Sequence, residues 1–187
     1  IAVTGISDPE RINSIPVSYN FFSVLGVQPA LGRLFTADES NYSGPPPSVV
    51  LTYEFWQRHF GADPLAVGRT IALNGASVTV AGVLPKRFDF AAAFAPGFRV
   101  DLYYPQALTS GANREGNTLM AIGRLAPGVT LDRARAEAAV IGPAIQRRDF
   151  TRPFALGLTS LADRVNGQTR PALILLATAY AARLEAL

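Results

Sequence analysis

An α+β fold is the class that this 187-residue sequence predicts, and three observations lead to it. Two runs of alternating apolar residues meet at Asn74-Gly75, which is the strongest short-range signal of a β-hairpin. One long amphipathic helix is expected over residues 131–148. Strand-like runs at 117–125 and 153–161 flank that helix, so the three segments predict a right-handed βαβ unit.

The composition is that of a globular domain with a sizeable core. Apolar residues make up 49% of the chain and charged residues 17%, which excludes a disordered protein. The 14 prolines and 16 glycines divide that core into short elements. The net charge is +3, but no run of five basic residues occurs, so the clustered charge of a nucleic-acid-binding protein is missing. The lack of cysteine excludes disulfides, thiolate catalysis and cysteine-ligated metals.

The first third of the chain predicts a short helix followed by loops. Residues 18–26 fit a helix with Ser18 as its N-cap and Gly26 as its left-handed C-terminal residue. Its buried face is expected to hold Phe21, Phe22 and Leu25. Residues 27–35 are expected to be extended. The Pro/Gly-rich 38–47 segment predicts a polar, mobile loop.

The middle of the chain predicts a strand, a helix and the hairpin. Residues 48–51 form an apolar strand, Thr52 is placed to cap the helix 53–60, and Gly61 ends it. The apolar face of this helix is expected to hold Phe55, Trp56, His59 and Phe60. The hairpin strands are predicted at 69–74 and 77–84, and a further strand at 101–104, after the loop 85–99.

The long helix carries local signals at both ends. Thr130 is its predicted N-cap and Asp132 lies at the positive end of its dipole. Its apolar stripe is expected to consist of Leu131, Ala134, Ala138, Ile141 and Ile145. Gly142-Pro143 predicts a kink or a break.

The apolar run 171–187 closes the chain. Eleven uncharged residues, 172–182, fall short of the roughly twenty that cross a bilayer. The run therefore reads as an amphipathic helix or as the first turns of a membrane helix. The N-terminal residues show no secretory signal.

His59, the only histidine, raises the question of catalysis because Glu54 and Asp63 lie near it in sequence. Residues five apart on a helix do not stack, and Asp63 lies beyond Gly61, which ends the helix. No nucleophile or second histidine accompanies the group. We therefore expect His59 to be a packed or boundary residue.

The other conspicuous residues also favour structural roles. Trp56 is expected to anchor the core, with a ligand platform as the alternative. The pairs Asp38/Glu39 and Asp8/Glu10 read as solvated loop residues. The sequence contains neither of the glycine-rich nucleotide-binding motifs GxGxxG and GxxxxGKS/T. The sequence thus predicts no catalytic, cofactor-binding or metal-binding residue and no cofactor, and it singles out no partner-binding residue.

Five blocks of the sequence follow one another with ordinary spacing. They are VSYNFFSVLGVQPALGRLF (17–35), VVLTYEFWQRHFGADPLAVGRTIALNG (49–75), VTVAGVLPKRFDF (78–90), LYYP (102–105) and LMAIGRLAPGVTLDRARAEAAVI (119–141). Together they resemble the extracytoplasmic domain of MacB-like and FtsX-like ABC transporter permeases, most closely the acidobacterial-type permease group. The run 167–176 resembles the approach to the second membrane helix of those permeases.

The resemblance implies a porter-like βαβ layer plus a smaller β-rich lobe. Residues 1–47 and 106–170 would form the porter-like α+β subdomain. Residues 48–105 would form the β-rich lobe, with the Trp-containing helix and the Asn-Gly hairpin. Residues 171–187 would be the start of a truncated membrane helix or a vector-derived tail. Since members of this group begin the domain earlier and continue into a long apolar helix, we expect a chain trimmed to its soluble piece.

The resemblance also implies a place and a role. The domain would lie on the extracytoplasmic side of the inner membrane, in a permease that dimerises and works with a cytoplasmic ABC ATPase. It would transmit ATP-driven movement to efflux or other work outside, in some members with a periplasmic adaptor protein. A first rival is a free-standing peptide- or glycan-binding module with a pocket near Trp56 and Tyr103/Tyr104. A second rival is a hydrolase, for which the sequence offers no nucleophile or metal constellation.

Overall fold

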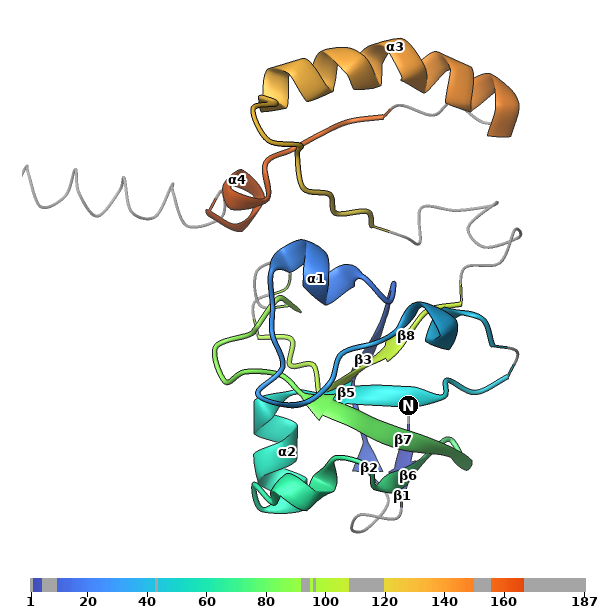
Figure 1. Ribbon diagram of the computed structural model, residues 1–187, viewed down its shortest axis with the longest axis vertical. Coiled ribbons are helices and arrows are strands. Elements are labelled where there is room, and N and C mark those ends of the chain that lie inside the picture. Colours follow the sequence, from blue (N-terminus) through green and yellow to red (C-terminus); the bar gives the residue numbers. More distant parts are fainter. Residues whose placement is uncertain are drawn as a thin grey trace, which may run out of the picture. The chain divides into compact units, whose positions relative to one another are not determined.

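The computed structural model describes residues 2–4, 10–42, 44–91, 95, 97–107, 120–149 and 156–166. The chain divides into two compact units (Figure 1), Ile1–Ala92 with Gly97–Arg124 and Ala93–Pro96 with Leu125–Leu187. This division differs from the predicted subdomains, because strands from segments 1–47 and 48–105 pair within one sheet. The predictions for 171–187 lie outside the described residues.

The first unit is built on a mixed sheet. Its strand order is β2-β1-β6-β7-β5-β8-β3, and β4 also pairs with β7. The strands are β1 (Ala2–Thr4), β2 (Glu10–Arg11), β3 (Ser14–Val17), β4 (Leu31–Gly32), β5 (Ser48–Leu51), β6 (Thr70–Leu73), β7 (Ala76–Val83) and β8 (Leu102–Pro105). Two pairs are parallel, β3 with β8 and β5 with β7, and the remaining pairs of this sheet are antiparallel. A mixed sheet with helices confirms the α+β class.

The hairpin of β6 and β7 confirms the Asn-Gly prediction. Leu73 pairs with Ala76 across the turn. Asn74 has φ +48° and Gly75 has φ +83°, so both central residues take the left-handed conformation that a tight hairpin turn requires. Asparagine and glycine tolerate that conformation best.

Helix α2 (Tyr53–Phe60) follows its predicted bounds. The Thr52 hydroxyl accepts a hydrogen bond from the Phe55 amide at 3.3 Å. Gly61 ends the helix with φ +59°. The predicted apolar face is confirmed, because Phe55, Trp56 and Phe60 are buried and the His59 side chain is only 9% exposed.

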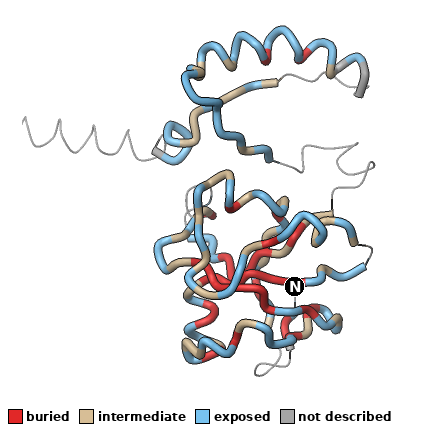
Figure 2. The backbone as a smooth tube through the Cα atoms, viewed as in Figure 1, coloured by how far each residue is buried: buried red, intermediate tan, exposed pale blue. Residues whose placement is uncertain are grey.

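The central strand β5 is buried on both faces of the sheet (Figure 2). Val49 and Leu51 pack with the aromatic residues of α2 in one core cluster. Val50, which points to the opposite face, packs with Phe22 and Phe35 in a second cluster. Continuous apolar strands of this kind need cover on both sides. The core therefore has two layers, one on each face of the sheet.

Helix α1 (Phe21–Leu25) begins later than predicted. Asn20 occupies the N-cap position, and the Ser18 hydroxyl instead donates to the Asn20 side-chain oxygen at 2.8 Å. Ser18 as the cap was therefore wrong. Gly26 is confirmed as the left-handed C-terminal residue, with φ +74°. Phe22 is fully buried, whereas Phe21 and Leu25 are half-buried.

The segment predicted as a mobile loop contains a 3-10 helix, η1 (Ala37–Ser40). Thr36 and Glu39 form a capping box at its start, in which each side chain meets the backbone of the other residue. A second 3-10 helix, η2 (Pro64–Ala66), follows α2. The Asp63 carboxylate caps it by accepting from the Leu65 amide at 2.9 Å.

The second unit contains α3 (Leu131–Asp149) and α4 (Leu161–Asn166). The Thr130 cap is confirmed, since its hydroxyl accepts from the Arg133 amide at 3.2 Å. The sequence predicted a kink or a break at Gly142-Pro143. Helix α3 runs continuously through Pro143, so the break does not occur.

The buried face of α3 differs from the predicted apolar stripe after Ala138. Ala138 is buried, but Ile141 is 49% exposed. Gly142 is the buried residue instead, and a Cβ atom added there would lie 3.7 Å from the Leu156 Cβ. A Cβ atom at that distance would make an ordinary van der Waals contact, so this packing does not require glycine.

The predicted βαβ unit is not found in the described residues. Residues 120–125 and 156–160 carry no strand, and Leu161 begins a helix. Residues 117–119 and 153–155 lie outside the described residues. Alternating apolar residues become a strand only where a neighbouring strand satisfies their backbone groups. The described pairings give neither segment such a neighbour.

Candidate functional site

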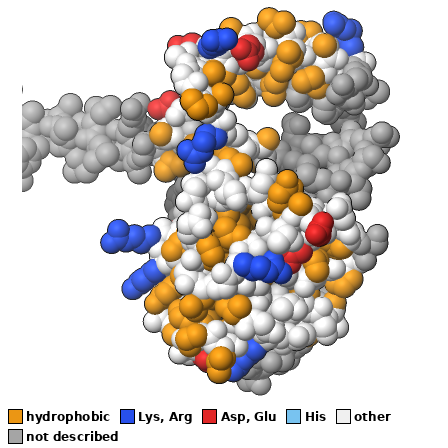
Figure 3. Space-filling view, in the orientation of Figure 1, with side chains coloured by type: hydrophobic (Ala, Val, Ile, Leu, Met, Phe, Trp, Pro, Cys, Tyr) orange, Lys and Arg blue, Asp and Glu red, His pale blue; other side chains and the backbone are white. Residues whose placement is uncertain are grey.

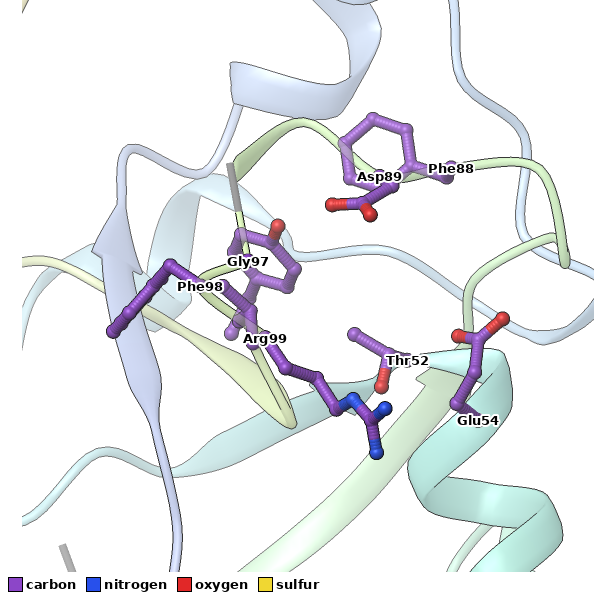
Figure 4. Close-up of a pocket in the computed structure, with 9 residues that line it drawn as sticks. Thr52, Glu54, Phe88, Asp89, Gly97, Phe98 and Arg99 are labelled. Carbon is purple, nitrogen blue, oxygen red and sulfur yellow. The ribbon is translucent and has the colours of Figure 1, made fainter. Parts of the chain in front are cut away.

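A pocket of about 330 Å³ lies in the first unit, where three separate segments meet (Figure 4). They are the start of α2, the loop after β7 and the approach to β8. The residues that line it are Thr52, Glu54, Phe88, Asp89, Gly97, Phe98, Arg99, Val100 and Tyr103. This volume is at the lower end of the range for small-molecule sites, about 300–1,000 Å³.

The buried part of the pocket lining is formed by Thr52, Val100 and Tyr103. Tyr103 is 1% exposed, and the other two are each 6% exposed. The Thr52 hydroxyl donates to the Asp101 carbonyl oxygen at 3.0 Å, in addition to capping α2. The Tyr103 ring packs against Phe22 and Phe88, with ring centroids 5.4 and 6.0 Å away. These contacts fix this part of the lining.

The Tyr103 hydroxyl belongs to a buried residue of the pocket lining. Burial raises the pKa of this phenol far above its ordinary value, and the Asp89 carboxylate raises it further. The phenol therefore stays protonated, and it offers a hydrogen bond within the pocket lining.

Three charged side chains surround the same space (Figure 4). Glu54 lies in the first turn of α2, Asp89 in the loop after β7, and Arg99 on the approach to β8. Glu54 and Arg99 make no hydrogen bond or ion pair with another described side chain. The exposed Phe98 ring, 43% accessible, adds an apolar surface. The pocket thus combines the unpaired charges of Glu54 and Arg99 with aromatic surface.

His59 lies outside this pocket and belongs to a network that joins α2 to β2 and to the residue before β8. Its Nε2 atom lies 3.0 Å from a Glu10 carboxylate oxygen and 3.0 Å from the Arg58 Nε. Arg58 also contacts the Asp101 carboxylate at 2.8 Å, and that carboxylate accepts from the Asn13 amide at 3.0 Å. The ring lies 4.4 Å from the Phe55 ring. These contacts agree with the prediction that His59 is a packed residue at the boundary of the core.

Neither of the two carboxylates considered as partners of His59, Glu54 and Asp63, contacts it through an ion pair or a hydrogen bond among the described residues. Asp63 pairs with Arg69 at 2.9 Å and caps η2. Glu54 points to the pocket described above. The His–carboxylate pair that does form uses Glu10, which sequence spacing could not indicate because β2 lies far from α2 along the chain.

Trp56 is confirmed as a core anchor, being 7% exposed. Its indole N–H donates to the Asp63 carbonyl oxygen at 2.9 Å, which ties α2 to the turn that follows it. The rival hypothesis of a binding module would need a pocket near Trp56 and Tyr103/Tyr104, and of these three residues only Tyr103 lines the pocket described above.

Of the two acidic pairs predicted to be solvated, Asp38 is exposed as predicted, but Glu39 is not. Glu39 is clamped by Arg33 at 2.8 and 2.9 Å and by the Thr36 amide at 2.8 Å, and its side chain is 12% exposed. Burial raises the pKa of this carboxyl, but the hydrogen bonds and the charge of Arg33 outweigh it and hold the pKa at about 2. Glu10 pairs with His59, and Asp8 lies outside the described residues.

Within the described ranges, no group of three or more His, Cys, Asp or Glu residues is placed to hold a metal ion. A search of those residues for a helix long and apolar enough to cross a bilayer also finds none. On the face of the first unit drawn in Figure 3, the Lys and Arg side chains do not gather into one continuous patch.

Sequence reasoning missed the residues that make the pocket. Phe88, Asp89, Phe98 and Arg99 fall in the segment 85–99, which the sequence identified only as a loop. Aromatic and charged residues in a loop that joins two buried strands were the available signal. They did not indicate that α2 would supply the opposite side.

A family model described as the MacB-like periplasmic core domain matches residues 2–141 of this chain. Comparison with curated protein sequences finds no match. Among solved structures, the periplasmic region of MacB from Actinobacillus actinomycetemcomitans gives a TM-score of 0.53 at 19% identity, over 79% of this chain and 64% of that one.

Two further solved structures are similar. A domain of a protein assigned as a permease from Porphyromonas gingivalis gives a TM-score of 0.51 at 15% identity, over 88% of this chain and 77% of that one. The extracellular domain of the noncanonic ABC-type transporter YknZ from Gram-positive bacteria gives 0.42 at 16% identity, over 56% and 48%. The structures with the two higher TM-scores confirm the fold. This chain spans 64% of the length of the MacB periplasmic region.

Proposed function

The chain belongs to the MacB-like periplasmic core domain family, and we propose that it is the non-catalytic extracytoplasmic domain of an ABC transporter permease. The family match over residues 2–141 is the observation that carries this proposal. The partners that follow are a cytoplasmic ABC ATPase, a second copy of the permease and, outside the membrane, an adaptor protein. The acidobacterial-type subgroup stays a prediction from the sequence.

In this proposal the domain couples ATP hydrolysis in the cytoplasm to export or other work outside the inner membrane. A domain that passes on movement needs a rigid body. The two-layered core of the first unit supports that role, because α2 and β5 are held by fully buried side chains. The commitment of His59 and Trp56 to packing contacts supports a mechanical rather than a catalytic use of the domain.

The location can be tested by thiol labelling in intact cells. The chain has no cysteine, so one substitution supplies the only thiol in this domain. In the full-length permease, with any other cysteines replaced, Leu65→Cys places a thiol at a position 74% exposed. We expect a membrane-impermeant maleimide to label it without lysis. The buried control Phe22→Cys should react only after unfolding. Labelling of Leu65→Cys that requires lysis would contradict the proposed location.

The gene gives an independent test of the same proposal. Membrane helices encoded on both sides of this segment are expected for a permease. A secretory signal upstream and a stop codon soon after Leu187 would instead favour a free-standing binding module.

A further inference from the structure

We propose that the pocket between α2, the loop after β7 and the approach to β8 binds a small zwitterion that carries an apolar side chain, such as an amino acid or a dipeptide. Three features of the described residues lead to this ligand class. They are the unpaired charges of opposite sign, the buried phenol in the lining and the aromatic surface.

The two unpaired charges indicate which charged groups the ligand carries. The Glu54 carboxylate has no partner among the described residues and suits a ligand ammonium group. The Arg99 guanidinium is likewise unpaired among them and suits a carboxylate, which it can hold with two parallel hydrogen bonds. A purely anionic ligand would place its charge near the Glu54 carboxylate. A purely cationic ligand would leave Arg99 without a partner. A zwitterion satisfies both ends.

The Tyr103 hydroxyl supplies a third polar contact. It belongs to a residue only 1% exposed that lines the pocket. A protonated phenol can donate one hydrogen bond. A ligand polar group that enters the pocket can accept this hydrogen bond.

The aromatic side chains of the lining favour an apolar group on the ligand. Phe88 is held edge-on against Phe22, with ring centroids 5.6 Å apart, so its position is fixed. Phe98 makes no ring contact with another described aromatic residue and remains 43% exposed. Apolar and aromatic ligand groups gain free energy by covering such a surface. The volume of about 330 Å³ limits the ligand to a small molecule.

Binding of phenylalanyl-alanine to the ¹⁵N-labelled 187-residue chain tests the proposal. Two matched probes remove one end charge each, the N-acetylated dipeptide and the dipeptide amide. We expect saturable shifts of the Glu54, Arg99 and Tyr103 amide signals with the parent dipeptide. Loss of one charge-assisted contact should weaken binding about tenfold or more.

Variants assign each end of the ligand to its residue. Glu54→Gln should bind the parent dipeptide about tenfold more weakly and should no longer distinguish it from the acetylated probe. Arg99→Gln should behave in the same way toward the amide probe. Glu137→Gln, at an exposed position of α3, is the control and should leave all affinities unchanged. These three side chains are exposed to solvent, so folding should be preserved.

Two results would overturn the proposal. One is the absence of saturable shifts with the parent dipeptide at low-millimolar concentrations. The other is binding of equal strength by the parent, acetylated and amidated probes. Neither result bears on the membrane location tested by thiol labelling.

Discussion

Helices α2 and α3 are stabilised in different ways. Helix α2 has eight residues and places Phe55, Trp56 and Phe60 in the core. Helix α3 has nineteen residues, yet Val140 is 78% exposed and Ile141 49% exposed. Its side-chain support comes from the Thr130 cap and from ion pairs one turn apart, Arg133 with Glu137 and Arg135 with Asp132.

The comparison shows that a helix can be predicted equally well for two different physical reasons. An isolated eight-residue helix is unstable in water, so α2 depends on the sheet that it covers. Helix α3 is long enough for local signals to matter, and each of its ion pairs contributes only about 0.2–0.5 kcal/mol. Substitutions should therefore be costly in α2 and mild at exposed positions of α3.

The largest expected effect comes from Phe55→Ala. Phe55 is fully buried, so its truncation leaves a cavity and should lower the free energy of unfolding by about 3–5 kcal/mol. Val140→Ala in α3 is the matched truncation and should change it by less than about 0.5 kcal/mol. Urea unfolding followed by Trp56 fluorescence measures the first unit directly, and circular dichroism follows both. Similar losses in the two variants would contradict the comparison.

Gly82→Ala tests close packing within the sheet. A Cβ atom at Gly82 would meet the carbonyl oxygens of Arg33 and Leu31, the latter at 2.7 Å. Because these are backbone atoms, the strands must shift, at an expected cost of about 1–3 kcal/mol. Gly157→Ala in the second unit meets nothing within 4 Å and serves as the control. Thermal unfolding of both variants provides the measurement, and an unchanged midpoint for Gly82→Ala would show that β4 and β7 are not packed as described.

The two N-caps give a paired test. Thr52→Ala removes the α2 cap and the hydrogen bond to the Asp101 carbonyl oxygen, both in a buried position. We expect a loss of about 1–2 kcal/mol. Thr130→Ala removes only the exposed cap of α3 and should cost about 0.5–1 kcal/mol. Denaturant unfolding gives both values. A larger loss of stability for Thr130→Ala than for Thr52→Ala would contradict the conclusion that substitutions cost more in α2 than in α3.

The smallest expected effect is the contribution of the Glu39 carboxylate to the free energy of unfolding, which depends on pH. Its pKa is about 2 in the folded chain and 4.5 by reference. A lowered folded-state pKa stabilises the fold above the unfolded value, so this contribution is lost as pH falls from 4.5 toward 2. Because Arg33 is half exposed, solvent screening reduces the contribution to about 1 kcal/mol. Stability of Glu39→Gln should fall less steeply over that window, whereas Glu137→Gln should follow the parent curve.

Local patterns predicted the parts of this fold that local physics determines. Thr52 and Gly61 set the ends of α2, and Asn74-Gly75 set the hairpin turn. The pairing of β3 with β8 joins residues far apart in sequence, such as Ile15 and Tyr103, and no local pattern marks it. The described parts of the strands predicted beside α3, 120–125 and 156–161, carry no strand for the same reason, since a strand depends on its neighbour.

The candidate site shows this limit more clearly. Its lining comes from three segments, and Tyr103 is the one lining residue that the sequence analysis connected with a pocket. Glu54 was considered as a partner for His59, but the fold turns it to the pocket and gives His59 to Glu10. Which charged residues face one another is decided by the packing of the segments, so the sequence alone could not assign them.

The most direct test of the proposed role is a distance measured during nucleotide turnover. Spin labels attached at Leu65→Cys in both copies of the full-length permease, together with its ATPase, report the separation of the two extracytoplasmic domains. Because Leu65 is 74% exposed, the label should not disturb the core. We expect the distance distribution from double electron–electron resonance to differ between the nucleotide-free and ATP-analogue-bound states. Identical distributions in a transporter that hydrolyses ATP would contradict coupling of this domain to ATP hydrolysis.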